Sequence, residues 1–412
     1  MKAILERAFR TAVEAAQPAK VLLEHLPNIP KGRTVVVGAG KAASNMALAF
    51  EQAWQGECSG VVVTRYGHSG LRLPKKIRVL EASHPLPDKA GQHATLEILK
   101  TLEHLSGDDL VVCLISGGGS ALMAAPNGIT LAEKIALTDE LLRSGADISE
   151  MNIVRKHLSK VKGGQLAVAA FPASVCSLIV SDVVGDDLSS IASGLTVPDP
   201  SSFAEALEIL NRYKILAPAA RTHLERGVKG EILETPKPGD ARFERVENRL
   251  IVTNKNSLEA AKLELNRAGF EARVLSDSIT GEATDAALEH AKIAQNLASG
   301  QALLSGGETT VTILNTNTGR GGRNLEFLLA FALQNPGCYA LAADTDGIDG
   351  SSFAAGGFVT PDTLTRAEKL GFNAAEFLKR HDAHGFFEGL GDLLVTNPTG
   401  TNVNDFRLIL KG

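Results

Sequence analysis

The sequence contains few cysteines and no long apolar run. Its four cysteines lie far apart and form no CxxC pair, so neither a zinc site nor a disulfide framework is predicted. No uncharged apolar segment reaches the roughly 18 residues needed to span a bilayer. The expected N-terminal amphipathic helix, over residues 1–25, is interrupted by charges, which argues against a secretion signal. We therefore expect a cytoplasmic protein without a membrane partner.

The sequence also lacks an excess of positive charge. It has 42 basic and 47 acidic residues, giving a net charge of -5. This balance provides no general attraction for nucleic acid or an anionic membrane surface. Any anionic ligand must therefore be bound locally, and we expect small-molecule partners.

The length of 412 residues predicts two domains, because single cores stop growing at about 250–300 residues. Short β-branched runs alternate with helical patterns, which indicates α/β sandwiches, the first Rossmann-like with a mostly parallel sheet. The segment Glu234–Asp240 has a linker composition, so we expect domains over 1–236 and 237–412. The second domain is expected to begin with a strand at 250–253 and to include another at 309–314.

Three glycine-rich loops follow or precede the regular elements. Val35–Ala43 runs from a strand into a helix through Gly38, Gly40 and Lys41, and this turn suits a phosphate group. It matches neither the Walker A spacing nor a complete Rossmann GxGxxG pattern. A sharp turn with a surface lysine is the alternative.

The second loop, Ser116–Ser120, contains three successive glycines at the end of a buried strand, which indicates close backbone approach to a ligand. The third, Gly319–Asn324, carries Arg320 and Arg323 beside bare backbone, which suits bidentate capture of carboxylate or phosphate oxygens. The alternatives are a flexible connection and a solvated basic loop.

Two acidic clusters follow strands, at Ser181–Asp187 and at Asp344–Gly350. An aspartate there suits magnesium binding with substrate phosphates, or proton transfer as a general base. The second cluster superficially resembles an EF-hand, but Ile348 occupies a ligand position and the downstream glutamate is missing. Calcium storage is therefore excluded, while a cap or turn role for each aspartate stays open.

Two further segments carry polar groups that are weak signals alone. The Ser83–Asp88 turn fixes His84 at its tip, and residues 152–164 contain Arg155, Lys156, Lys160 and Lys162. A packed histidine and a solvated lysine face are the alternatives.

Together these strings resemble the class II glycerate kinase family, also called glycerate 2-kinase, with its C-terminal MOFRL domain. The likeness rests on GAGKA, HPLPD, SGGGSA, NIVRKHLSKVKGGQLA, SDVVGDD, SGGE with GRGGRNLE, DTDGIDG and the closing NPTGTNVND. It extends over nearly the whole chain and places the MOFRL region at about 300–408.

The resemblance implies transfer of the ATP γ-phosphoryl group to the 2-hydroxyl of D-glycerate, with Mg²⁺, in a cleft between the domains. It implies catalytic roles for Lys41, Asp182 and Arg320, and metal binding by Asp182 or Asp344. The expected substrate- or nucleotide-binding residues are Gly38, Gly40, His84, Ser116, Gly117, Gly118, Gly119, Ser120, Arg155, Lys156, Arg323, Asp344 and Asn397. A monomer or homodimer is expected.

The main alternative is an NADPH-dependent hydroxypyruvate reductase, a name often given to members of this family. A Rossmann site for NAD requires an acidic residue after the second strand, where this chain has Thr64-Arg65. This pair excludes the usual NAD partner but is compatible with the 2′-phosphate of NADP, and the incomplete glycine pattern argues against either cofactor. A serine hydrolase is disfavoured because no GxSxG elbow is present. A non-enzymatic sugar- or nucleotide-binding regulator would not need both charge types in facing loops.

Overall fold

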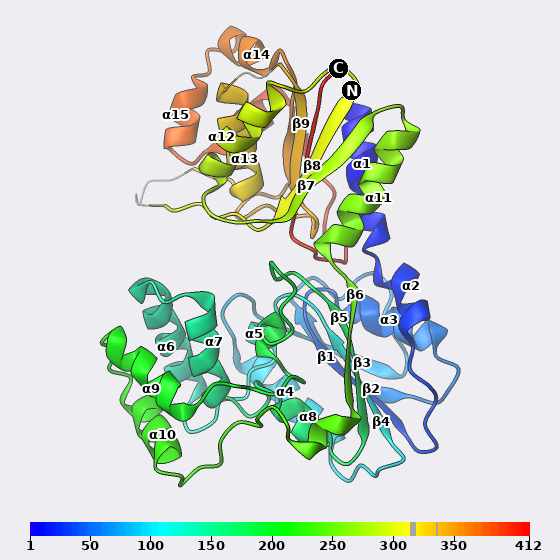
Figure 1. The fold of residues 1–412 in the computed structure, drawn as a ribbon, viewed down its shortest axis with the longest axis vertical. Coiled ribbons are helices and arrows are strands. Elements are labelled where there is room, and N and C mark those ends of the chain that lie inside the picture. Colours follow the sequence, from blue (N-terminus) through cyan, green and yellow to red (C-terminus); the bar gives the residue numbers. More distant parts are fainter. Residues whose placement is uncertain (314–318, 335–336) are drawn as a thin grey trace. The chain divides into compact units, whose positions relative to one another are not determined.

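The computed structural model describes residues 1–313, 319–334 and 337–412. The chain forms two compact units, each with its own sheet and helices (Figure 1). The Rossmann-like unit comprises Pro18–Ser181 and Asp186–Ile251, and the C-terminal unit comprises Met1–Gln17, Asp182–Gly185 and Val252–Gly412.

The Rossmann-like unit has one six-stranded sheet in the order β3-β2-β1-β4-β5-β6. The pairs β1–β2, β2–β3, β1–β4 and β4–β5 are parallel, which confirms the predicted mostly parallel sheet. Every residue of β1 and β4 is buried, as expected for parallel strands covered on both faces. The strands are β1 (Thr34–Ala39), β2 (Ser59–Arg65), β3 (Ile77–Ala82), β4 (Leu110–Ile115), β5 (Ser174–Val180) and β6 (Val246–Val252).

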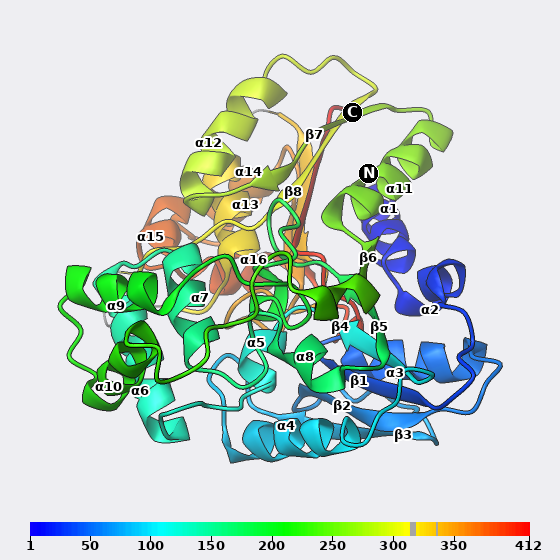
Figure 2. The ribbon, with the colours of Figure 1, turned by 60° about the horizontal axis from the view of Figure 1, so that its bottom comes forward.

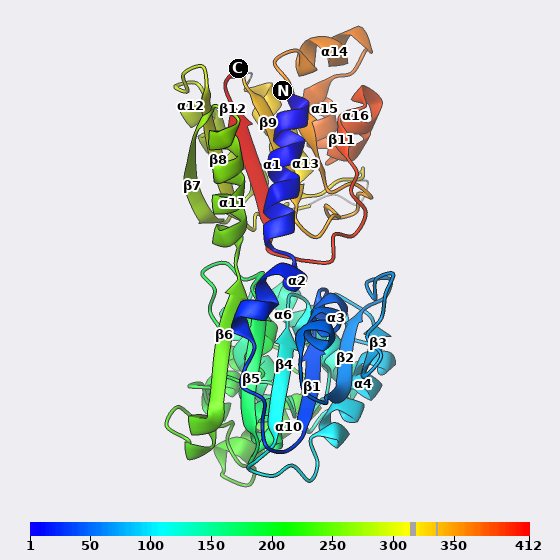
Figure 3. The same ribbon diagram turned by 90° about the vertical axis from the view of Figure 1, so that its right-hand side faces the viewer.

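Helices cover both faces of this sheet, with α3 on one face and α4 on the other (Figure 3). A group formed by α6, α7, α9 and α10 lies beside the sheet and packs around its own hydrophobic cluster (Figure 2). The α-helices are α2 (Pro18–Val21), α3 (Ala43–Ala53), α4 (Lys89–Thr101), α5 (Gly119–Leu122), α6 (Leu131–Ser144), α7 (Ile148–His157), α8 (Gln165–Ala170), α9 (Phe203–Arg212) and α10 (Pro218–Val228). Short 3₁₀ turns are η1 (Leu22–His25), η2 (Ile191–Ser193) and η3 (Ala241–Arg245).

The C-terminal unit has a mixed six-stranded sheet in the order β11-β10-β9-β12-β8-β7. The last strand, β12, lies between β8 and β9 and runs antiparallel to both, whereas β7 and β8 are parallel. The strands are β7 (Glu271–Ile279), β8 (Gln301–Gly307), β9 (Tyr339–Asp344), β10 (Gly356–Val359), β11 (Leu393–Leu394) and β12 (Asp405–Leu410).

Helices α1 and α11 cover one face of the second sheet, and α12 and α13 cover the other (Figure 1). Each face has a separate hydrophobic cluster, so the sheet is sandwiched between two apolar layers. The helices are α1 (Lys2–Ala15), α11 (Asn254–Arg267), α12 (Ala283–Ala294), α13 (Arg323–Leu333), α14 (Thr363–Lys369), α15 (Ala374–Lys379) and α16 (Ala383–Leu390). Both units are thus α/β sandwiches, as predicted.

The division into compact units differs from the one expected at residue 236. The N-terminal helix breaks before Pro18, and its first part, α1, packs on α11 in the C-terminal unit. A strand at 250–253 was expected to begin the second domain. These residues instead overlap the end of β6, which joins the edge of the first sheet. The proline-rich segment is held to the Rossmann-like unit by a hydrogen bond from Asp199 N to Pro236 O at 2.8 Å. The polar composition of Glu234–Asp240 therefore reflects a segment that crosses the surface of one unit, not a linker between the two units.

The prediction of a strand at 309–314 was wrong for residues 309–313, which the structure describes. Thr310 forms only an isolated bridge with Glu282, and no strand covers residues 309–313. Leu314 lies outside the described residues. Two backbone hydrogen bonds, from Thr310 N to Gly281 O and from Ala283 N to Thr310 O, hold the segment at this bridge, and Glu282 also accepts from the Thr310 and Thr312 hydroxyls.

Candidate active site

In the first sheet, the side on which successive strands are added changes between β1 and β4. The chain proceeds from β1 outward to β2 and β3, then returns to β4 and continues to β5 and β6 on the other side. In open α/β sheets, ligands bind outside the carboxyl ends of the strands at this point. The loops that follow β1 and β4 here are the glycine-rich Gly38–Lys41 and Ser116–Ser120.

These two loops are bonded to each other. Lys41 N donates to Gly117 O at 2.8 Å, and Ala42 N donates to the Ser116 hydroxyl at 3.0 Å. Gly40 has φ +142°, and a Cβ there would lie 2.1 Å from Ser116 Oγ, so only glycine allows this approach. Ser116 is fully buried and joins the loops, which is a positioning role and not that of an exposed nucleophile.

Lys41 and His84 meet at Gly118. Gly118 has φ +82°, and a Cβ there would lie 3.0 Å from His84 Cδ2, 3.2 Å from His84 Nε2 and 3.5 Å from Lys41 Cγ. The His84 imidazole and the alkyl part of the Lys41 side chain, from distant segments, therefore flank bare backbone at the strand ends. Such a site offers a positive charge and backbone contact to an anionic ligand.

Ser120 belongs to a chain of polar side chains that leads away from the loop. Its hydroxyl lies 2.8 Å from the Ser193 hydroxyl, which donates to Asn152 Oδ1 at 3.1 Å. Ala192, Ser193 and Gly194 all have positive φ, of 50°, 59° and 64°. Backbone strain of this kind is concentrated at functional sites. Ser193 was missed from the sequence, because its hydroxyl reaches the loop only in the fold.

The predicted basic residues Arg155 and Lys156 have different environments. Lys156 Nζ donates to the buried Asp199 carboxylate at 3.3 Å, so its charge is compensated. Arg155 is partly buried without a carboxylate neighbour, and burial lowers the pKa of its guanidinium. Both lie on α7, which begins with a capping box between Asp147 and Glu150.

Two buried lysines near Arg155 were not selected from the sequence. Lys134 on α6 is 6% exposed, and Lys162 is fully buried. A signal for Lys134 was present, because it shares the buried face of α6 with Leu137 and Leu141, where lysine is unexpected. Lys162 was noted in the 152–164 segment, but only the structure shows its contacts, because its ammonium donates to Ser120 O at 2.8 Å and Met123 O at 3.2 Å.

The C-terminal unit places the two predicted arginines in different settings. Arg323 at the start of α13 contacts Asp405 at 2.6 Å, Asp344 at 2.8 Å and Glu308 at 3.1 Å. Although burial opposes it, these carboxylates raise the pKa of Arg323 above its ordinary value. Its charge is therefore already balanced by protein groups.

Arg320 has an exposed guanidinium with one weak ion pair. Its side chain is 57% exposed, and Nη2 lies 3.4 Å from Glu388, which is itself half exposed. Its backbone is fixed by Asp382 Oδ1, which accepts from Arg320 N at 3.2 Å. An exposed pair of this kind contributes little, so Arg320 can exchange Glu388 for an anionic ligand at small cost.

The predicted aspartates and Asn397 belong to one group of loops in the same unit. The Asn402 amide donates to Asp182 Oδ2 at 3.1 Å, and the Asn404 amide donates to Asp182 O at 2.6 Å. Asn397 has φ +60°, and its carbonyl would lie 2.2 Å from a Cβ on Gly347, within the Asp344–Gly350 loop. The closing segment of the sequence thus supports both acidic clusters.

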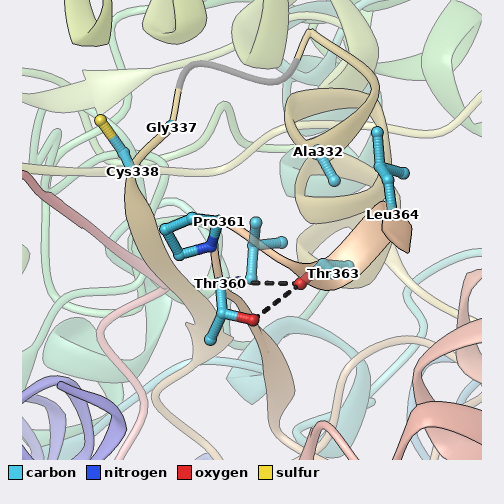
Figure 4. Close-up of a pocket in the computed structure, with 8 residues that line it drawn as sticks. Ala332, Gly337, Cys338, Thr360, Pro361, Thr363 and Leu364 are labelled. Carbon is cyan, nitrogen blue, oxygen red and sulfur yellow. Dashed lines mark hydrogen bonds between the residues drawn. The ribbon is translucent and has the colours of Figure 1, made fainter. Parts of the chain in front are cut away.

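Two cavities lie in the C-terminal unit. One, between Cys338, Pro361 and Leu364, has a volume of only about 10 Å³, enough for one water molecule (Figure 4). A larger one of about 340 Å³ lies between α1 and the 396–399 segment, lined by Phe9, Gln17 and Thr399. The volume of this second cavity is large enough for an organic ligand, and it lies next to the Asn397 loop.

Within the described residues, no helix combines the length and apolar character needed to cross a bilayer. Residues 4–225 match the family described as a domain of unknown function, DUF4147, and residues 301–405 match the MOFRL family.

Relatives cover nearly the whole chain. A glycerate 2-kinase of Pyrococcus horikoshii is 43% identical over 98% of this chain and 93% of its own. A protein of Agrobacterium vitis named "Putative hydroxypyruvate reductase" is 47% identical over 99% of this chain and 94% of its own. The crystal structure of a glycerate kinase from Thermotoga maritima superposes with a TM-score of 0.89 at 36% identity, covering 100% of this chain and 99% of that one.

Proposed function

Because this chain belongs to the glycerate kinase family with a MOFRL region, we propose that it transfers the ATP γ-phosphoryl group to the 2-hydroxyl of D-glycerate. The products are 2-phospho-D-glycerate and ADP. The chain is an enzyme that phosphorylates glycerate, and the proposal adds the nucleotide and the position of attack.

The observation that best supports phosphoryl transfer is the meeting of Lys41, His84 and the glycine loops at the ends of β1 and β4, where the strand order changes side. Phosphoryl transfer needs positioning and charge neutralisation more than covalent catalysis. In this proposal Lys41 neutralises charge on the transferring phosphoryl group. The backbone of Ser116–Ser120 approaches the phosphates closely, since Gly117, Gly118 and Gly119 carry no side chains.

We assign the remaining chemical roles to the C-terminal unit. Arg320, with its exposed guanidinium, stabilises negative charge that develops in the transition state. Asp182 accepts the proton of the attacking hydroxyl or binds metal. Arg323 is better described as a positioning residue, because three carboxylates already surround it.

Magnesium fits this set of residues as a nucleotide-bound ion. Among the described residues, no group of three or more His, Cys, Asp or Glu side chains is arranged to hold a metal. Mg²⁺ usually binds one or two carboxylates together with substrate phosphates, and it supplies charge neutralisation there. Asp182, which accepts from the Asn402 amide at 3.1 Å, and Asp344, which is ion-paired with Arg323 at 2.8 Å, are the two candidate carboxylates for that role, and we prefer Asp182.

The reductase activity suggested by the Agrobacterium vitis name is the second candidate. At the end of β2, the Thr64 hydroxyl donates to Lys41 O at 3.3 Å, so this position supports the lysine loop. β2 itself ends in Thr64-Arg65 and has no acidic residue of its own for the ribose of NAD, although Arg65 is compatible with the 2′-phosphate of NADP. This arrangement favours the kinase.

One coupled assay tests the proposal. The purified protein receives ATP, Mg²⁺ and D-glycerate, with enolase and without phosphoglycerate mutase. Since enolase accepts only 2-phosphoglycerate, formation of phosphoenolpyruvate is expected. Absence of that product, together with NADPH oxidation by hydroxypyruvate, would show a reductase instead.

A further inference from the structure

Three cationic side chains gather in the Rossmann-like unit without a counter-charge. Lys134 comes from α6, Arg155 from α7, and Lys162 from the segment before α8. Helices α6 and α7 pack around one hydrophobic cluster, which brings the first two together. The cluster is mostly enclosed, since Lys134 is 6% exposed and Lys162 is not exposed at all.

The electrostatics of this cluster are repulsive. Burial, followed by Arg155, lowers the pKa of Lys134 to about 8. Burial, followed by Lys134 and Arg155, lowers the pKa of Lys162 well below its ordinary value. In the part of the chain that the structure describes, no hydrogen bond or ion pair reaches the Lys134 ammonium or the Arg155 guanidinium.

Buried charges in proteins are normally paired or bind a charged ligand, because an isolated one is costly to remove from water. The neighbouring Lys156 follows this rule through Asp199. Among the described residues Lys134 and Arg155 have no such partner, and none of their side-chain nitrogens is sealed from solvent, so a small anion that enters from solvent can pair with both.

The cluster is connected to the strand-end loop. Lys162 directs its ammonium to the carbonyls of Ser120 and Met123, and it therefore holds the end of the SGGGS loop. Asn152 stands one turn before Arg155 on α7 and joins Ser120 through Ser193. An anion held by Lys134 and Arg155 is thus positioned relative to the loop that flanks Lys41.

We propose that Lys134 and Arg155 bind the carboxylate of the hydroxy-acid substrate, with Lys162 as a positioning residue that fixes Ser120 beside it. This inference rests on the proposed function. A carboxylate fits better than the nucleotide phosphates, because the nearly complete burial of Lys134 and Lys162 favours a small ligand. The phosphates have their own site at the Lys41 loop.

The test compares Lys134→Met and Arg155→Met with Lys160→Met, an exposed lysine of the same segment. Each of the first two should raise the KM for D-glycerate by about tenfold to a hundredfold, the usual effect of losing a charge-assisted hydrogen bond. The KM for ATP should change by less than about twofold, since these residues do not contact the nucleotide. Arg155→Lys should recover much of the loss, and Lys160→Met should match the wild type.

Stability provides a second readout that separates binding from a structural role. Without ligand, Lys134→Met should melt at the same or a higher temperature than the wild type, because it removes an uncompensated buried charge. Calorimetry with D-glycerate alone should show weakened binding in the same variant, and glycerol should bind neither protein measurably. A destabilised Lys134→Met with unchanged glycerate affinity would mean that Lys134 is structural.

Other results would overturn the inference in distinguishable ways. A raised KM for ATP with an unchanged KM for D-glycerate would assign the cluster to nucleotide phosphates. Variants that behave like the wild type in both KM values would show that the cluster binds neither substrate. A wild-type protein that turns over no D-glycerate with ATP would instead refute the proposed function, before any variant is compared.

Discussion

Replacing Gly118 with alanine should damage catalysis more than stability. Gly118 has φ +82°, and the added Cβ would lie 3.0 Å from His84 Cδ2 and 3.5 Å from Lys41 Cγ. The imidazole must therefore move by a few tenths of an ångström, whereas the distance to Lys41 Cγ is an ordinary van der Waals contact. Because catalytic groups lose about 100-fold in rate when misplaced by 1 Å, we expect kcat to fall by about tenfold.

Gly230→Ala is the matched control. Gly230 has φ +76°, but no atom lies within 4 Å of its added Cβ. Both substitutions place an L-residue in the left-handed region, so both should lower the free energy of unfolding by about 1–2 kcal/mol. Only the crowding of His84 differs between the two variants.

Steady-state kinetics with D-glycerate and ATP, together with urea denaturation, separates the two effects. Gly118→Ala should show reduced kcat, whereas Gly230→Ala should keep the wild-type value. Equal kcat in both variants would refute the argument that His84 and Lys41 must stay close to bare backbone.

Three other outcomes are expected from the same physical arguments. Lys41→Met should lower kcat by about 100- to 1,000-fold at unchanged melting temperature, and an unchanged turnover would contradict its role. Arg323→Met should lose about 1–3 kcal/mol in urea denaturation, because buried Asp405 keeps its ion pair with Arg407 but loses the hydrogen bond from Arg323. Arg320→Met should lose activity and little stability, and the reverse pattern would exchange their roles. Burial lowers the pKa of His290 to about 4 from 6.5. The neutral imidazole therefore contributes about 3 kcal/mol to the free energy of unfolding above pH 6.5, and this contribution is lost as the pH falls through 4. His290→Gln should therefore show a shallower fall in unfolding free energy between pH 7 and 4, and an identical slope would contradict the assignment.

Much of the local structure followed from the sequence, because it depends on short-range patterns. The buried β-branched runs of β1 and β4 and the glycine loops after them were visible as strings of residues. Capping boxes such as Thr130 with Glu133 similarly mark where helices begin. The order of the family's motifs identified the chain without any knowledge of their contacts.

The limits of the compact units did not follow from the sequence. Whether α1 packs on α11, and whether β6 pairs with β5, depends on contacts between residues that are far apart in the chain. Composition indicates that a segment such as Glu234–Asp240 is exposed, but it does not indicate which of the two units the segment packs against. A linker and a surface crossing therefore looked alike.

The sequence by itself determined the family, the two α/β sandwiches and the positions of the glycine-rich loops that we propose carry the chemistry. Tertiary structure alone decided which charges are already paired. Arg320 and Arg323 are neighbours in a single loop, yet one is exposed and the other is enclosed by three carboxylates. Lys134 and Arg155 are ordinary helix residues until folding brings them together, with Lys134 buried and neither paired with an acid of the described residues. The physical reason is that the cost of a charge depends on its desolvation and its partners, which only the folded chain provides.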